Sequence, residues 1–414
     1  MKNNRKVYSW LACGVIVAAR RLLLVAAPLL CHSYYVRGAL PIVNYLGIKS
    51  GMNNMKYTID NHIKGSDSNS QEAGCEFPRY EIRFLDVKDA DCIVIMYQKD
   101  KDTGRKIVLV DSGNVSDSAR IKQFLKEEFN TTVIDLAICS HPDSDHKGGF
   151  FGLLEDPSIK VREFWWKNPY KYITDDDFSR MEKASSKRDA CECVYNHPTD
   201  ATKNLLDLAR TKKNSDGGKC DCYSVECGCK HNEIPLAVIG PTEKYYTEAA
   251  VGIVQDFAEL KVDPDTTKYD EKDEVSEEEA KSVIDAEPEK SYTNMGSLVL
   301  LFEPRANMRF LLTGDASSAS LRDIYDSRKG DIAGCILKVP HHGSKHNLNS
   351  KIIDDLNPSA SIISAAGTRK HPNVAIVRYL SKYGNVYSTH KSGDLFYTSW
   401  PHNRSAEPLK KKMQ

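Results

Sequence analysis

Residues 133–149 read VIDLAICSHPDSDHKGG, an apolar strand that leads directly into a loop rich in histidine and aspartate. The loop places His141, Asp143, Asp145 and His146 within six residues. Imidazoles and carboxylates are metal ligands, and carboxylates packed this closely need a cation to offset their repulsion. A solvated acidic loop that caps a helix is the alternative interpretation. We favour the metal site because similar residues recur later in the chain.

Two later apolar strands end in residues of the same kind. The strand FLLTGD, residues 310–315, ends at Asp315, and LKVPHHGS, residues 337–344, contains His341 and His342. Sites in open α/β sheets form at the carboxyl ends of strands. We therefore expect these strand ends and the loop after residue 138 to converge on one site.

Strand and helix patterns alternate along most of the remaining chain. Short apolar or alternating runs such as 80–87, 91–98 and 106–113 predict strands. Residues 116–129 have helical spacing, and so do residues 371–384. This rhythm predicts a layered α/β fold rather than an all-α or all-β one.

Charge is balanced overall but uneven along the chain. The 414 residues carry 57 basic and 57 acidic side chains, so the net charge indicates no particular partner. From Gln255 to Lys290 there are 14 acidic and 5 basic residues, a net of −9, which leaves about +9 on the other residues. Neither a P-loop nor a G-x-S-x-G motif is present. These absences argue against NTPase and serine hydrolase activity, and no nucleotide cofactor is expected.

The first 31 residues contain two apolar runs separated by Arg20 and Arg21. Neither run reaches the roughly 20 residues that span a bilayer, and arginines at the centre of a span would be costly. The segment is either a membrane or export signal or a leader outside the folded protein. We expect a cytoplasmic protein, with membrane contact or export through residues 1–31 as the alternative.

Several motifs resemble one known family. HPDSDHKGG resembles the H-x-[HD]-x-D-H-x-G-G signature of the metallo-β-lactamase fold superfamily. More closely, the chain resembles the hydrolase domain of the DNA-uptake competence protein ComEC. The motifs that carry this resemblance are FLDVKDADCIVI, VLVDSG, NMGSLVLLF, FLLTGD, KVPHHGS and HPNVAIVRYL with GNVYSTHKSGDLFY, in order from Phe84 to Tyr397. The resemblance implies an αββα sandwich with two insertions.

The resemblance also implies a site for two divalent metal ions. Its ligands would be His141, Asp143, Asp145, His146, His342, Asp315 and Asn294. The first two belong to one ion, the next three belong to the second, and Asp315 bridges the pair. Asn294 and Asp143 stand where many members of the superfamily have histidine. An oxygen-rich first site favours Mn²⁺ or Mg²⁺, whereas the precedent of the superfamily favours Zn²⁺.

The implied activity is hydrolysis by a hydroxide held between the two ions. The predicted catalytic residues are Asp145, His371 and His341. Asp145 would orient the hydroxide, and His371 would donate to the substrate oxyanion or act as a general acid. We expect a phosphodiesterase or nuclease, with nucleic acid as its substrate. The alternatives are a hydrolase of lactones, thioesters or β-lactams, and a non-catalytic binding or regulatory protein of the same fold.

A cluster of cysteines has no counterpart in the resemblance. It comprises Cys191, Cys193, Cys220, Cys222, Cys227 and Cys229, in three C-x-C pairs. These thiolates are sufficient for a structural Zn²⁺, although the usual spacing is C-x₂-C. Disulfides and free thiols are the alternatives.

These observations divide the chain into eight segments. They are an apolar leader (1–55), a linker (56–76), the first half of the hydrolase domain (77–172), a cysteine-rich insertion (173–232), a strand of the domain (233–242), an acidic insertion (243–290), the second half of the domain (291–404) and a basic tail (405–414). The acidic insertion is expected to be a solvated helix or disordered.

Overall fold

Two mixed β-sheets form the centre of the protein, and the first has the strand order β15-β1-β2-β3-β4-β5-β8. Its strands are β1 (Arg79–Phe84), β2 (Ile93–Gln98), β3 (Lys106–Val110), β4 (Val133–Ile138), β5 (Lys160–Trp166), β8 (Asp221–Ser224) and β15 (Leu395–Thr398). Strands β3, β4, β5 and β8 are parallel, whereas neighbours among β15, β1, β2 and β3 are antiparallel.

The second sheet has the order β14-β13-β12-β11-β10-β9. Its strands are β9 (Leu236–Gly240), β10 (Val299–Arg305), β11 (Met308–Leu312), β12 (Ile336–Lys338), β13 (Ala360–Ile363) and β14 (Asn385–Ser388). Strands β11 to β14 are parallel to one another, and β10 is antiparallel to both of its neighbours.

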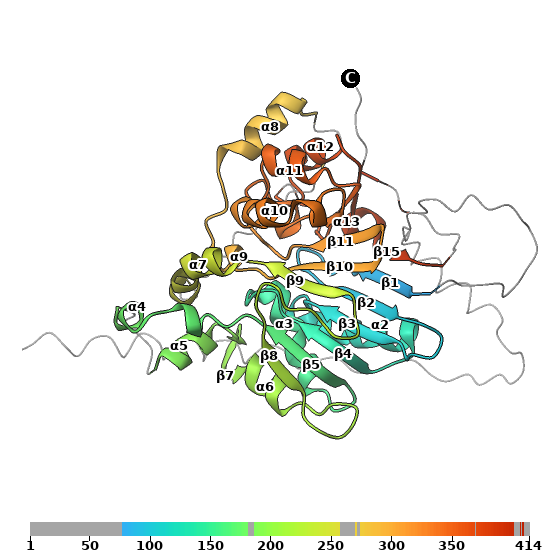
Figure 1. Ribbon diagram of the computed structural model, residues 1–414, viewed down its shortest axis with the longest axis vertical. Helices are drawn as coiled ribbons and strands as arrows, with labels where there is room; N and C mark the ends of the chain where they lie inside the picture. The colour runs from blue at the N-terminus through green and yellow to red at the C-terminus, as the bar shows by residue number, and fades with distance from the viewer. Residues whose placement is uncertain are drawn as a thin grey trace, which may run out of the picture. The chain divides into compact units, whose positions relative to one another are not determined.

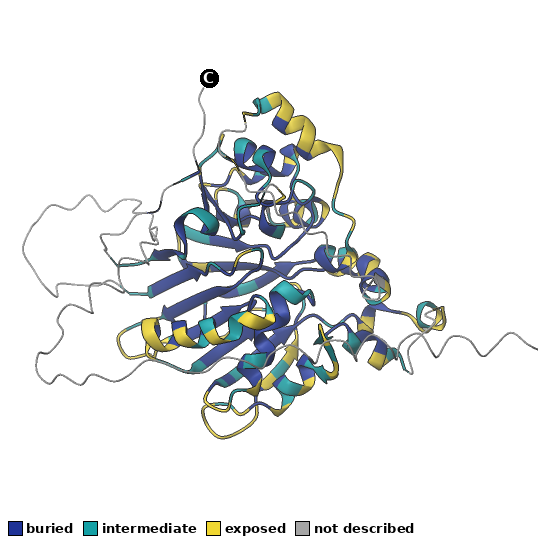
Figure 2. Cartoon of the chain, turned by 180° about the vertical axis from the view of Figure 1, so that it is seen from behind, coloured by how far each residue is buried: buried dark blue, intermediate teal, exposed yellow. Residues whose placement is uncertain are grey.

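Separate apolar cores lie between the layers. Buried residues of both sheets, such as Ile95 and Leu136 of the first and Phe302 and Phe310 of the second, form the core between the sheets. A second core joins the first sheet to its covering helices, α2 (Ser118–Phe129), α3 (Ser144–Glu155) and α6 (Leu205–Thr211). A third joins the second sheet to α8 (Glu277–Ala286), α10 (Ser318–Ile332), α11 (Ser350–Leu356) and α12 (Val374–Leu380). Figures 1 and 2 show these helices on the outer faces of buried sheets, so the predicted αββα sandwich is confirmed.

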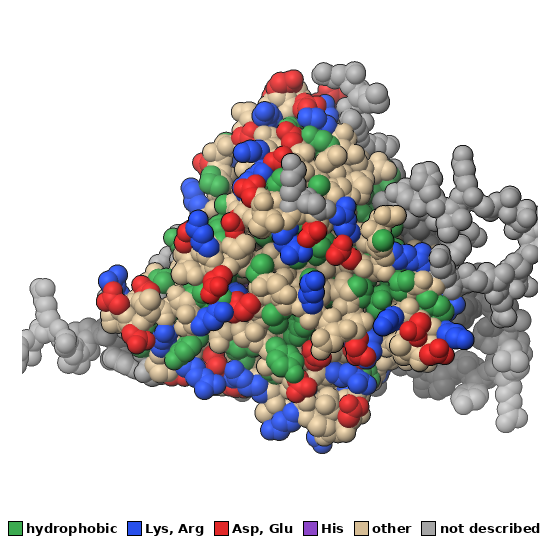
Figure 3. All heavy atoms as spheres, viewed as in Figure 1, with side chains coloured by type: hydrophobic (Ala, Val, Ile, Leu, Met, Phe, Trp, Pro, Cys, Tyr) green, Lys and Arg blue, Asp and Glu red, His purple; other side chains and the backbone are tan. Residues whose placement is uncertain are grey.

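The computed structural model describes residues 77–180, 186–256, 270, 274–368, 370–400, 406 and 408–409. The apolar leader, the linker, the centre of the acidic insertion and most of the basic tail lie outside these residues. Within them, no helix is both long enough and apolar enough to cross a membrane. Acidic and basic side chains are interspersed over the face that Figure 3 shows.

The helix predicted over residues 116–129 is present as α2, after the 3₁₀ turn η2 (Val115–Asp117). It buries Ile121, Phe124, Leu125 and Phe129, because these residues lie on one face at helical spacing. The helix ends at Asn130, which adopts a left-handed conformation with φ of 49°.

The cysteine-rich segment is part of the sandwich. Strand β8 pairs with β5 and forms one edge of the first sheet, and α6 packs in the same core as α3. The segment also contains α4 (Asp175–Ser179), α5 (Lys187–Cys193), and the hairpin of β6 (Asn196–His197) and β7 (Asp200–Asn204), and it follows the 3₁₀ turn η3 (Tyr170–Tyr172). The segment therefore contributes a strand to the first sheet and a helix to the core that covers it.

The described parts of the acidic segment are also packed against the domain. Helix α7 (Glu243–Asp256) buries Tyr246 and Ile253, and α8 buries Ala280 and Ile284 against the second sheet's helices. Charged residues cover the outer face of α8, which Figure 2 shows as exposed. Residues 243–256 and 277–286 are thus helical, and α8 has a solvated outer face while its inner face packs on the domain.

Lys212 fixes the end of α3, although a lysine is rarely buried. Its Nζ donates to the carbonyl oxygens of Leu153, Leu154 and Asp156 at 3.1, 2.7 and 2.6 Å. These carbonyls end a helix and lack partners within it. We expect Lys212→Met to lower the free energy of unfolding by about 1–3 kcal/mol, measured by urea denaturation. The neighbouring exposed Lys213→Met is the control, and an equal effect in both variants would contradict this role.

Candidate metal centre

The predicted metal loop lies between β4 and α3, at the carboxyl end of β4. Asp143 is the N-cap of α3, and the backbone N–H groups of His146 and Lys147 donate to its carbonyl oxygen. Ser112, which follows β3, donates to the carbonyl of His146 through both its backbone N–H (2.7 Å) and its Oγ (3.0 Å). Gly149 permits this contact, because a Cβ there would lie 2.1 Å from the carbonyl oxygen of Ser112. These contacts fix the backbone of the loop.

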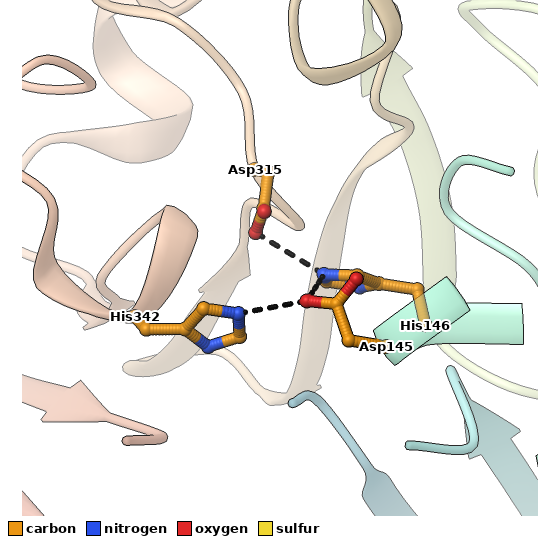
Figure 4. Close-up of side chains that lie close together, drawn as sticks. All are labelled: Asp145, His146, Asp315 and His342. Carbon is orange, nitrogen blue, oxygen red and sulfur yellow. Dashed lines mark hydrogen bonds and ion pairs between the residues drawn. The ribbon is translucent and has the colours of Figure 1, made fainter. Parts of the chain in front are cut away.

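One group of candidate ligands contains Asp145, His146, Asp315 and His342 (Figure 4). One ligand atom from each lies within 4.8 Å of all the others. His146 Nε2 lies 3.6 Å from Asp145 Oδ2 and 3.4 Å from Asp315 Oδ1, and His342 Nε2 lies 3.0 Å from Asp145 Oδ2. Two ligands of a tetrahedral ion with bonds of about 2.1 Å are separated by about 3.4 Å. The spacing therefore suits a single divalent cation.

Hydrogen bonds at Nδ1 orient both imidazoles of this group. His146 Nδ1 lies 2.8 Å from Asp111 Oδ2, and His342 Nδ1 lies 3.0 Å from the carbonyl oxygen of Ser364. Both partners accept hydrogen bonds, so each ring carries its proton on Nδ1 and turns Nε2 toward the group. Such partners are typical of metal-binding histidines.

A second group lies on the other side of Asp315. His141 Nε2 lies 3.7 Å from Asp143 Oδ2 and 3.9 Å from Asp315 Oδ2, and His341 Nε2 lies 4.0 Å from Asp315 Oδ2. Asp315 thus turns Oδ1 toward His146 and Oδ2 toward His141 and His341. A carboxylate with one oxygen in each group is suited to bridge two cations.

Three atoms of the predicted metal ligands are buried and have no hydrogen-bond partner among the described residues. They are His141 Nε2, His146 Nε2 and Asn294 Oδ1. A buried acceptor without a partner costs about 1–3 kcal/mol, so native proteins rarely leave three in one place. Cations bound in the two groups would satisfy all three, so the residues fit a metal centre.

The pKa values in the site reflect crowded charges. Burial, together with the neighbouring Asp145, raises the pKa of Asp143 to about 6. Burial and the neighbouring His146 lower the pKa of His141 to about 4. Burial also opposes ionisation of Asp315, but His146 and His341 outweigh it and hold the pKa of Asp315 well below its usual value. The carboxylates therefore depend on nearby positive charge.

The other two predicted catalytic histidines border the site. His341 has positive φ, as does His342, in the 3₁₀ turn η4 (His341–Gly343), so their rings point in different directions. Burial lowers the pKa of His341, but Asp315 and Glu289 outweigh this effect and raise it to about 9. The ring of His371 lies 5.3 Å from that of His341 and 5.8 Å from that of His342. Burial and these two rings lower the pKa of His371 to about 2, which favours a neutral hydrogen-bond donor over a general acid.

Three further residues, which the sequence did not identify, lie against the candidate ligands. Lys338 is fully buried and forms an ion pair with Asp91, whose carboxylate lies 3.8 Å from Nδ1 of both His146 and His342. The structure places Asp91 behind the ligands. A lysine in the otherwise apolar strand CILKV was the available signal. Glu289 was counted with the acidic segment, but its carboxylate lies against His341 at 3.1 Å.

The six clustered cysteines do not form a metal site in the described part of the chain. Cys191 lies in a small core beside α7, Cys220 and Cys222 lie in the core behind the first sheet, and Cys229 packs against the core between the sheets. The metal-binding groups found among the described residues contain no cysteine. All six are free thiols, so neither the structural Zn²⁺ nor the disulfides are supported.

Comparison with known proteins gives partial similarities. No family model matches the chain. ComE operon protein 3 of Bacillus subtilis (strain 168) is 31% identical over 116 residues, which are 27% of this chain and 14% of that protein. The chain therefore matches only a small part of that relative.

Similar solved structures share little sequence with the chain. A mutant of CmlA β-hydroxylase has a TM-score of 0.37 at 10% identity, over 78% of this chain and 54% of that one. The metallo-β-lactamase SMB-1 bound to 2-mercaptoethanesulfonate has a TM-score of 0.30 at 8% identity, over 64% of this chain and 82% of that one. The Rm3 metallo-β-lactamase has a TM-score of 0.29 at 12% identity, over 73% of this chain and 90% of that one.

The assignment of the fold rests on the chain's own architecture. Two sheets pack face to face, helices cover their outer faces, and the candidate ligands follow β4, β11 and β12. The layers and the position of the ligand loops together give this chain an αββα sandwich with its candidate metal ligands at the carboxyl ends of β4, β11 and β12.

Proposed function

We propose that the protein is a two-metal hydrolase of phosphodiesters and that its substrate is nucleic acid. The observation that carries the two-metal proposal is the position of Asp315, whose two carboxylate oxygens face two different groups of candidate ligands. His141 and Asp143 would hold the first ion, and Asp145, His146 and His342 would hold the second.

The chemistry divides between the ions and the chain. Two divalent cations held by these residues would supply a nucleophile at neutral pH and would neutralise charge on the phosphoryl oxygens. Asp145 lies at the rim of the ligand group, with about a quarter of its side chain exposed, and can orient a water molecule. His371 offers an N–H to the substrate oxyanion, because its ring lies beside His341 and His342.

Two features support a phosphodiester as the substrate. The ligands of the first ion include the oxygens of Asp143 and Asn294 in place of imidazoles. Harder oxygen ligands favour Mn²⁺ or Mg²⁺ over Zn²⁺. Outside residues 255–290 the chain carries about +9, which can attract a polyanion. The resemblance to a domain of a DNA-uptake protein points to the same substrate.

The purified full chain is expected to cleave DNA or RNA when Mn²⁺ is added, and more slowly with Zn²⁺. Single- and double-stranded DNA and RNA should be compared in parallel with Mn²⁺, Mg²⁺ and Zn²⁺. The rate at limiting substrate should fall steeply as salt rises from 50 to 200 mM (~10-fold or more), because phosphate contacts release counterions.

The Asp145→Ala variant, purified in the same way, controls for contaminating nucleases and should be inactive. The preparation could cleave no nucleic acid with any metal, yet open lactones or β-lactams with Zn²⁺. That result would contradict the proposed substrate but not the proposed metal-dependent hydrolysis. Equal activity of the variant and the native protein would contradict the site itself.

A further inference from the structure

The first metal ion, which His141 and Asp143 would hold, has too few ligands unless residues that the sequence pattern does not assign to it also contribute. His141 and Asp143 supply two ligands, and Asn294 replaces a histidine that would have supplied a third. Glu289 lies next to this gap. Its side chain is 10% exposed, although it comes from the most acidic stretch of the chain.

Both carboxylate oxygens of Glu289 are engaged. Oε1 accepts hydrogen bonds from the backbone N–H groups of Lys290 and Ser291, each at 2.8 Å. Oε2 lies 3.1 Å from both His341 Nδ1 and Asn294 Nδ2. The backbone N–H of Glu289 also donates to the carbonyl of His346 at 2.9 Å, which fixes the segment beside the turn that carries His341.

The contacts at Oε2 determine which atoms of His341 and Asn294 remain free to bind a metal ion. A carboxylate only accepts hydrogen bonds, so Asn294 must face Glu289 with its NH₂ group and turn Oδ1 away. That Oδ1 is buried and has no partner among the described residues. His341 must likewise carry a proton on Nδ1, which leaves Nε2 as its ligand atom, 4.0 Å from Asp315 Oδ2.

We propose that Glu289 is a positioning residue that makes His341 Nε2 and Asn294 Oδ1 ligands of the first metal ion, in place of the missing histidine. The inference rests on the proposed two-metal function. Together with His141 and Asp143 it gives the first ion two imidazoles and two oxygen ligands, besides Asp315. His341 is then a metal ligand rather than an independent catalytic residue.

Glu289→Gln is the discriminating substitution. Its amide oxygen can still accept from the backbone of Lys290 and Ser291, but an NH₂ group then faces His341 and Asn294, which both present donors. The orienting contact is lost while the local cap is retained. Glu287→Gln is the matched control, because Glu287 is an exposed carboxylate two positions away and the charge change is identical.

Binding of Mn²⁺ to the metal-stripped full chain, followed by titration calorimetry and by metal analysis after dialysis, tests the inference. The native protein and Glu287→Gln should bind two ions. Glu289→Gln should bind one ion normally and the other at least about 10-fold more weakly. His342→Ala should lose the other ion, and the double variant should bind neither.

Thermal unfolding separates positioning from a structural role. In EDTA, Glu289→Gln should unfold at the same temperature as Glu287→Gln, and only the rise caused by Mn²⁺ should be smaller. Native affinity for both ions in Glu289→Gln, or an equal loss of stability with and without Mn²⁺, overturns the inference but not the two-metal function. Fewer than two ions in the native protein overturns the proposed function. If Glu289→Gln does not fold, Glu289→Ala is measured against the same control.

Discussion

The Asp315→Asn variant is expected to lose both metal ions and to lower kcat/KM by at least about 10³-fold, or about 4 kcal/mol. Asp315 is buried, and each of its two oxygens faces a different group of ligands. An asparagine of the same shape removes the negative charge and can offer an oxygen to only one side. Loss of a single ligand at another position would instead weaken mainly one ion.

Metal content per chain and hydrolysis should be measured on the same preparation. Asp326→Asn is the control, because Asp326 follows on α10 and its side chain is 65% exposed. The control should keep two ions and full activity. An Asp315→Asn variant that retains one tightly bound ion would show that the carboxylate serves one site and does not bridge. Activity within 10-fold of the native rate would remove Asp315 from the centre altogether.

The sequence was sufficient to predict the parts of the site that are local in the chain. His141, Asp143, Asp145 and His146 lie in one loop, and the loop's backbone is fixed by contacts that follow directly from a strand–loop–helix unit. Asp315 follows its strand in the same way. The αββα fold was predictable as well, because the helix and strand periodicities are regular and the family motifs occur in order.

Residues that act through distant contacts were not predictable. Glu289 belongs by composition to a solvated acidic segment, and only the pairing of residue 289 with residue 346 places it at the site. Asp91 looks like a turn residue in the sequence. Its role depends on an ion pair with Lys338, which lies 247 positions away. Sequence spacing carries no information about contacts of this kind.

The cysteines show how little proximity in sequence says about proximity in the fold. Their proximity in sequence suggested a common site, but the three pairs lie on different elements and contact different cores. Cys191 lies within α5, Cys222 lies on β8, and Cys229 follows β8 in the chain. Local clustering predicts a site only where the loop itself is short and closed, as at residues 141–146.

Lys338→Met is expected to lower the free energy of unfolding by about 3–5 kcal/mol, because it leaves Asp91 as an unpaired buried charge. Both side chains are at most 1% exposed, and Lys338 Nζ also donates to the carbonyl of Gly314 at 3.2 Å. Asp91 in turn connects the ligand loops, since its N–H donates to the carbonyl of Asp145 at 3.1 Å. Urea denaturation in EDTA measures the loss without any contribution from metal binding.

The double variant Lys338→Met with Asp91→Leu separates the ion pair from the position of its residues. Replacing a buried ion pair by apolar side chains is often neutral for stability, so the double variant should recover most of the loss. It should still bind the ion held by His146 and His342 more weakly, because the carboxylate behind both rings is absent. Lys351→Met, at an exposed lysine on α11, is the control and should be neutral in both measurements. If the single variant is as stable as this control, the ion pair contributes nothing to the fold. If the double variant recovers both stability and native metal affinity, Asp91 does not support the ligands, and the metal centre depends only on the residues that face it.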